Sequence, residues 1–235
     1  MDPVHSSLQY GDVLLRGGFI VAVGVCLPSQ GCLVANAKGC LVTPGLVNTH
    51  HHLYQTMTRA VPVAQDAALF GWLQTLYPIW AAMRPDDFFT SAQVGMAELL
   101  LSGCTTTSDH LYLYPNGTRL EDTIHAAEAI GMRFHPTRGA MSIGESDGGL
   151  PPDHLVESEA AILDDMIRVI DTFHDPIVGS MLRVGVAPCS PFLVSRELMR
   201  DAAVLARDKG VMMHIHLADN DEDITYSLEK FGMRP

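Results

Sequence analysis

The chain has 235 residues, of which 47% are hydrophobic and 18% are charged, and its formal net charge is −12. Such a chain can bury a large core and is not expected to be disordered. The negative net charge argues against nucleic acid or an anionic membrane as a partner, because both are negatively charged and bind to positively charged protein surfaces.

The first 43 residues predict a small β-rich unit. Residues 12–16 and 19–23 are apolar runs on either side of Gly17 and Gly18, which is typical of two strands joined by a tight turn. Residues 40–43 are expected to add one more strand. We therefore treat residues 1–43 as one unit and residues 44–235 as another.

From residue 44 onward, strands are expected to alternate with helices. The apolar patterns predict five strands, at residues 46–49, 104–108, 132–137, 181–187 and 211–214. The helices are expected at residues 66–81, 84–103, 121–130, 156–173, 195–210 and 221–231. Strands that alternate with helices indicate an α/β fold with a parallel sheet and right-handed crossovers.

Polar side chains follow the ends of these strands. In α/β barrels the functional groups lie at the C-terminal ends of the strands. That position is occupied here by His50, His52, His110, Arg138, Ser190, His216 and Asp219. This regular placement is the strongest physical indication of a functional site in the sequence.

Three of these residues predict a metal site. On a strand His50 and His52 would point to one side and His51 to the other. Together with His216 they give three imidazoles and an open fourth position, which is typical of catalytic zinc. A metal there would lower the pKa of bound water, and Asp219 would transfer protons. His214 is read as a structural histidine, with a ligand role as the alternative.

Compartment and membrane association are also addressed by the sequence. The five cysteines are dispersed without CxxC spacing, which favours reduced thiols in a cytoplasmic protein over a disulfide framework. The N-terminus lacks the pattern of a secretory signal, and no apolar run is long enough to span a membrane.

The motifs resemble the amidohydrolase superfamily. The resemblance is carried by residues 44–53 (PGLVNTHHHL) and 214–219 (HIHLAD). Finer similarity to the guanine and cytosine deaminase-like branch, and within it most of all to 8-oxoguanine deaminases, lies in residues 54–56, 108–112, 137–142, 147–152 and 187–192.

The resemblance implies a metal-dependent (β/α)8 barrel of the TIM type, present here as strands one to five, beside a β-sandwich of which residues 1–43 are a remnant. It implies one zinc ion, with iron as an alternative, bound by His50, His52 and His216. Asp219 takes the position of the catalytic carboxylate. The substrate would be held by Gln55, Arg138, Cys189 and Ser190, to which we add His110 from its position at a strand end.

The implied reaction is the hydrolytic deamination of an aminated purine-type heterocycle, with 8-oxoguanine giving urate and ammonia as the first choice. Guanine, isoxanthopterin or a hydroxylated s-triazine are the alternative substrates. The expected partner is thus a small molecule, and a homo-oligomer is left open.

The sequence departs from the family pattern in two respects. Relatives usually carry Glu where this chain has Asp219. They also take a histidine from the sixth strand and an aspartate ligand from the eighth, and this chain stops before both. We therefore expect a C-terminally truncated homologue, with a catalytically incomplete fragment as the alternative to an active enzyme.

Overall fold

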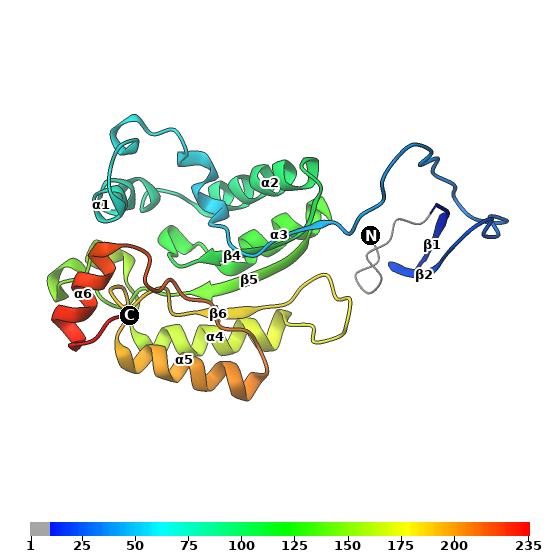
Figure 1. Ribbon diagram of the computed structural model, residues 1–235. Coiled ribbons are helices and arrows are strands. Elements are labelled where there is room, and N and C mark those ends of the chain that lie inside the picture. The colour runs from blue at the N-terminus through cyan, green and yellow to red at the C-terminus, as the bar shows by residue number, and fades with distance from the viewer. Residues whose placement is uncertain (1–9) are drawn as a thin grey trace. The chain divides into compact units, whose positions relative to one another are not determined.

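The structure is a computed structural model and describes residues 10–235 (Figure 1). The chain divides into two compact units, one ending at Leu46 and the other running from Val47 to Pro235, and each is described by itself. Part of the predicted unit of residues 1–43, including the N-terminus used to argue against a secretory signal, lies outside the described residues.

The first unit contains a β-hairpin. Strand β1 (Asp12–Arg16) pairs antiparallel with β2 (Phe19–Gly24) through a turn at Gly17 and Gly18, both of which have positive φ. The strand predicted for residues 40–43 is absent, and that prediction is wrong. This segment is exposed and no neighbouring strand pairs with it, so nothing fixes it as part of a sheet.

The second unit is built on a parallel sheet with the order β3-β4-β5-β6. Its strands are β3 (Leu46–Asn48), β4 (Cys104–Leu111), β5 (Arg133–Gly139) and β6 (Gly185–Ala187). The order follows the chain, so each connection crosses from one strand to its immediate neighbour. The alternation of strands and helices predicted from the sequence is therefore found in the structure.

Six α-helices accompany the sheet. In Figure 1, α2 and α3 lie next to each other beside β4 and β5, and α4 and α5 lie next to each other beside β5 and β6. Their bounds are α1 (Leu69–Trp80), α2 (Pro85–Leu101), α3 (Leu120–Ile130), α4 (Glu159–Phe173), α5 (Arg196–Lys209) and α6 (Asp221–Phe231). One short 3-10 helix, η1 (Leu53–Thr58), follows the histidine triplet directly.

Local sequence signals explain most of the helix ends. Ser195 is the N-cap of α5, and its side-chain oxygen accepts a hydrogen bond from the Leu198 N–H at 3.0 Å. Helices α3 and α5 end at Gly131 and Gly210, which adopt the left-handed conformation that glycine accepts without steric cost. These ends agree with the sequence prediction because they depend only on neighbouring residues.

The strands agree less well with their predicted bounds. Strand β4 extends beyond residue 108 to Leu111, so Asp109 and His110 lie within it. Strand β6 is short, and the predicted strand at residues 211–214 is reduced to a single bridge between Val186 and Met213. Among the described residues this last segment pairs only with β6, so it forms an incomplete ladder.

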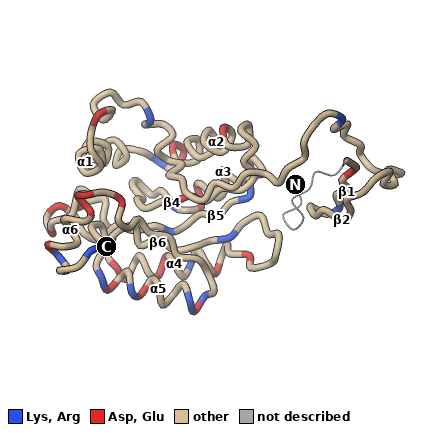
Figure 2. Tube along the Cα trace, viewed as in Figure 1, with Lys and Arg blue, Asp and Glu red and all other residues tan. Residues whose placement is uncertain are grey.

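Charged residues gather on the outer helices (Figure 2), where α4 and α5 carry acidic and basic side chains together. Lys209 on α5, for example, forms an ion pair with Asp171 on α4. No helix in residues 10–235 combines the length and the apolar character needed to cross a bilayer.

Arg138 on β5 belongs to a buried ion-pair network. Its side chain is only 2% exposed, and its guanidinium donates to Glu157 at 2.8 and 2.9 Å and to Asp165 at 2.8 Å. The guanidinium also lies 4.1 Å from the centre of the Tyr114 ring. These donors join β5 to the region of α4, and Arg138 does not line the cavity beside the histidines, so its predicted role in substrate binding stays a prediction without support from these contacts.

This network predicts a large stability effect. Replacing Arg138 (Arg138→Gln) leaves Glu157 and Asp165 without their cation and should lower the free energy of unfolding by about 3 kcal/mol or more. The matched control Arg59→Gln removes an ion pair with Glu98 whose side chains are more than half exposed, and should have a much smaller effect because solvent screens this pair. Urea unfolding of both variants measures the difference, and equal effects would contradict the structural role of Arg138.

Candidate metal and substrate site

Strand β4 holds the histidine triplet in place. The His52 Nδ1 lies 2.6 Å from the carbonyl oxygen of His110, and the His110 N–H donates to the carbonyl of His51 at 2.7 Å. One residue further on, the Leu53 N–H donates to the Asp109 carboxylate at 2.7 Å. These three contacts fix the segment after β3 against the end of β4, although β3 itself ends at Asn48.

Contacts with backbone carbonyls determine the protonation of two histidines. A carbonyl oxygen only accepts, so the hydrogen bond to His110 places the proton of His52 on Nδ1. The Nδ1 of His216 lies 3.3 Å from the carbonyl of Cys189 and is oriented in the same way. Both Nε2 atoms therefore carry lone pairs. A metal-binding histidine usually directs its other ring nitrogen to a carbonyl in this manner.

The two lone pairs face each other across a short gap. The Nε2 atoms of His52 and His216 are 3.2 Å apart. Burial lowers the pKa of His52 well below its ordinary value and that of His216 to about 4, so both rings stay neutral. Two nitrogens bound tetrahedrally to one zinc ion at 2.0–2.1 Å would be about 3.3 Å apart. The residues present therefore fit a divalent cation.

His50 completes the first set of three histidines. One nitrogen of each of His50, His52 and His216 lies within 4.8 Å of the others. Burial lowers the pKa of His50, and the negative charge of Asp219 opposes that shift. The carboxylate of Asp219 therefore acts electrostatically on the metal-binding group, which suits the proton-transfer role that the sequence predicts for it.

A cavity of about 210 Å³ adjoins these residues. Of the residues predicted for the site, it is lined by His50, His52, Gln55, Cys189, Ser190, His216 and Asp219. The wall also includes residues to which the sequence prediction gave no site role, among them Tyr112 and Phe192, and Trp72, for which a pocket role was an alternative to the core. Tyr112 comes directly after the end of β4, and the expectation that functional groups follow strand ends could have indicated it.

Three polar groups in this cavity could hold a substrate. The Gln55 side-chain nitrogen donates to the Tyr54 hydroxyl at 3.1 Å. The Ser190 hydroxyl is buried and has no hydrogen-bond partner within residues 10–235, so it is available to a ligand. Cys189 has a positive φ of 33°, and burial raises the pKa of its thiol, which keeps the thiol neutral.

His110 lies behind this wall and does not line the cavity. Its side chain is fully buried, and its ring stacks on that of His216 with the ring centres 4.5 Å apart. The predicted contact of His110 with substrate is therefore not made through the cavity. The structure instead places the ring among the other histidines.

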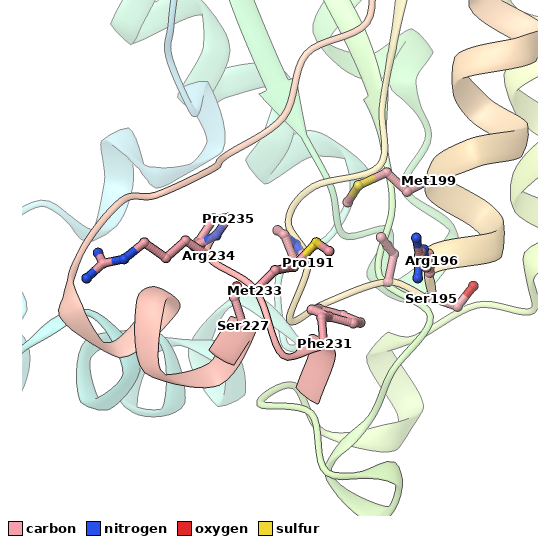
Figure 3. Close-up of a pocket in the computed structure, with 10 residues that line it drawn as sticks. Pro191, Ser195, Arg196, Met199, Ser227, Phe231, Met233, Arg234 and Pro235 are labelled. Carbon is pink, nitrogen blue, oxygen red and sulfur yellow. The ribbon is translucent and has the colours of Figure 1, made fainter. Parts of the chain in front are cut away.

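A second hollow of about 210 Å³ lies where α6 approaches the start of α5 (Figure 3). It is lined by apolar side chains such as Met199 and Phe231, together with Arg196 and Arg234, and by none of the histidines. Because it contains no group suited to acid–base or metal chemistry, we assign the reaction to the cavity beside His52.

Comparison with known proteins agrees with this geometry. Residues 41–235 match the model of the Amidohydrolase family. The chain belongs to the amidohydrolase family. Members of this family use a divalent metal, and the histidines of this amidohydrolase chain could bind one.

Two curated relatives are deaminases or related hydrolases. The chain is 45% identical to 8-oxoguanine deaminase of Pseudomonas aeruginosa over 210 residues, which cover 88% of this chain and 47% of that protein. It is 38% identical to hydroxydechloroatrazine ethylaminohydrolase of Pseudomonas sp. (strain ADP), covering 99% of this chain and 51% of the relative. The chain thus spans about half the length of these curated relatives.

A solved structure confirms the fold class. The atrazine chlorohydrolase of Arthrobacter aurescens TC1, crystallised with zinc, superposes with a TM-score of 0.86 at 29% identity, covering 97% of this chain and 52% of that one. Its fold is an amidohydrolase TIM barrel, so the prediction of an α/β chain with part of such a barrel is confirmed.

Asp109 is a buried acid that the sequence prediction did not single out. Its side chain is fully buried, and one carboxylate oxygen accepts from Leu53 while the other has no partner within residues 10–235. Burial raises the pKa of Asp109 to about 7. The folded protein therefore retains a proton that the unfolded chain releases near pH 4.

This shift predicts a pH dependence of stability. Between about pH 4 and pH 7 the folded state binds more protons than the unfolded state, so Asp109 makes the protein less stable as the pH rises, by up to about 4 kcal/mol. The variant Asp109→Asn keeps an acceptor for Leu53 and cannot ionise. Urea unfolding from pH 4 to 8 should show wild type losing stability relative to this variant, and parallel curves would contradict the assignment.

Proposed function

We propose that this chain carries the metal- and substrate-binding part of an aminohydrolase that removes an amino group from a purine-type heterocycle by hydrolysis. The best candidate substrate is 8-oxoguanine, which would give urate and ammonia. The proposal is supported by the facing Nε2 atoms of His52 and His216 beside a cavity that is both aromatic and polar. The deaminases among the relatives support the same type of reaction.

His50, His52 and His216 would hold the metal ion in this proposal. A divalent zinc ion, when bound, supplies a water activated for attack on carbon at neutral pH. The backbone carbonyls of His110 and Cys189 orient two of the rings and hold their protons on Nδ1. Iron is the alternative metal, because imidazole ligands also suit it.

Asp219 would move protons during the reaction. It follows His216 by three residues and lines the same cavity, and its charge partly opposes the lowering of the pKa of His50 and His216 that burial causes. Its carboxylate can take a proton from the attacking water and give a proton to the departing amino group. No other carboxylate among the residues of the described cavity can do this.

The heterocycle would bind between aromatic and polar walls. Trp72, Tyr112 and Phe192 supply the aromatic surface, and Gln55 and Ser190 supply hydrogen-bonding groups. A site built to hydrogen-bond a particular edge rejects analogues that lack it, so these two residues would select among 8-oxoguanine, guanine, isoxanthopterin and hydroxylated s-triazines.

The metal assignment is tested by zinc content. His216→Ala should lower the affinity for zinc by at least about a hundredfold, because one of three ligands is lost together with its orientation by Cys189. Elemental analysis after gel filtration measures the tightly bound zinc. His125→Ala, an exposed histidine on α3, is the matched control and should retain it. Unchanged zinc in His216→Ala would exclude this set of ligands.

The reaction is tested by ammonia release from 8-oxoguanine. Asp219→Asn should reduce the rate by about 10²- to 10⁴-fold while leaving the zinc content unchanged, because it removes a proton-transfer group and no ligand. Guanine, isoxanthopterin and 2-hydroxy-s-triazines are assayed in parallel to rank the substrates. Zinc binding without ammonia from any of them would favour the alternative, a chain that binds metal but lacks groups needed for turnover.

A further inference from the structure

Two histidines beside the proposed site are not used by the reaction. His110 lies on β4 and His214 lies on the segment that bridges to β6. Together with His50 they form a second set, in which one nitrogen of each residue lies within 4.8 Å of the others. The two sets share His50 and no other residue.

The contacts within this second set are close. The Nδ1 of His50 lies 3.1 Å from the Nε2 of His214. The ring centres of His110 and His214 are 5.0 Å apart, and those of His50 and His110 are 6.3 Å apart. The three rings therefore converge from β4, from the segment after β3 and from the segment beside β6.

His110 supplies the observation that points to a ligand. A hydrogen bond between His50 and His214 would give each of those two rings a partner, but it would leave the ring nitrogens of His110 without one. His110 is fully buried, and neither of its ring nitrogens has a hydrogen-bond partner within residues 10–235. A buried polar group without a partner destabilises the folded protein, and a bound cation would offset that cost.

We propose that His50, His110 and His214 form a second binding position for a divalent cation of the zinc type. Imidazole nitrogens suit zinc, copper, nickel and iron, whereas magnesium and calcium prefer oxygen. His50 is exposed and His214 is half-buried, so a cation can reach the set although His110 is buried. Because His50 belongs to both sets, the two positions are not independent. A cation bound at the second position would use His50 as a ligand and make it unavailable to the first position.

The proposal goes beyond the aminohydrolase reaction and is tested by zinc binding alone. The first set is broken by His216→Asn, and zinc binding is then measured by equilibrium dialysis at raised zinc concentration. This variant should still bind zinc, although more weakly than wild type. Adding His214→Asn should weaken that remaining binding by at least about tenfold. The double variant His216→Asn, His125→Asn is the matched control and should bind like His216→Asn.

Cobalt substitution gives a second measurement. Cobalt bound to His216→Asn should show ligand-field absorption that disappears when His214 is also replaced, and circular dichroism verifies that each variant is folded. Two results would overturn the second position: no zinc binding by His216→Asn, or equal binding by the two double variants. Zinc binding that is unchanged in His216→Asn and is lost when His214→Asn is added would support the second position and contradict the first.

Discussion

The site depends on the contacts between the end of β4 and the segment that follows β3. Strand β3 has only three residues and stops before His50, so its own ladder cannot orient the histidines. Hydrogen bonds from Leu53 to Asp109 and between His52 and His110 do this instead. Two of these partners are buried polar groups on β4, where a lost hydrogen bond leaves an unsatisfied atom away from water.

Backbone carbonyls also explain why the ring nitrogens of His52 and His216 converge. The carbonyl of His110 fixes the proton of His52, and the carbonyl of Cys189 does the same for His216. These two orientations bring the Nε2 atoms of the two rings to 3.2 Å from each other. A metal ion held by these residues, as we propose, would bind the folded state only and would therefore stabilise it.

The sequence predicted the parts of the fold that depend on neighbouring residues. The order of strands and helices, the glycine ends at Gly131 and Gly210 and the serine cap at Ser195 were all predictable. The length of β4 and the near absence of a strand at residues 211–214 were not, because a ladder depends on residues far away in the chain. The prediction of a strand at residues 40–43 was wrong for the same reason.

Position at a strand end also could not separate the roles of the polar residues. Arg138 and Ser190 both follow apolar runs, yet the first is held by Glu157 and Asp165 while the second keeps a free hydroxyl in the cavity. The difference arises because the acids that hold Arg138 come from a later part of the chain.

The backbone position of Asp219 is likewise determined by its surroundings. Ala218 before it has a positive φ of 58°, which only a constrained turn imposes on alanine, and the Asp219 N–H donates to Asp223 at 3.2 Å. The backbone of this turn is thus fixed at the start of α6. The short side chain of Asp219 therefore reaches the cavity beside His52 from a fixed backbone position.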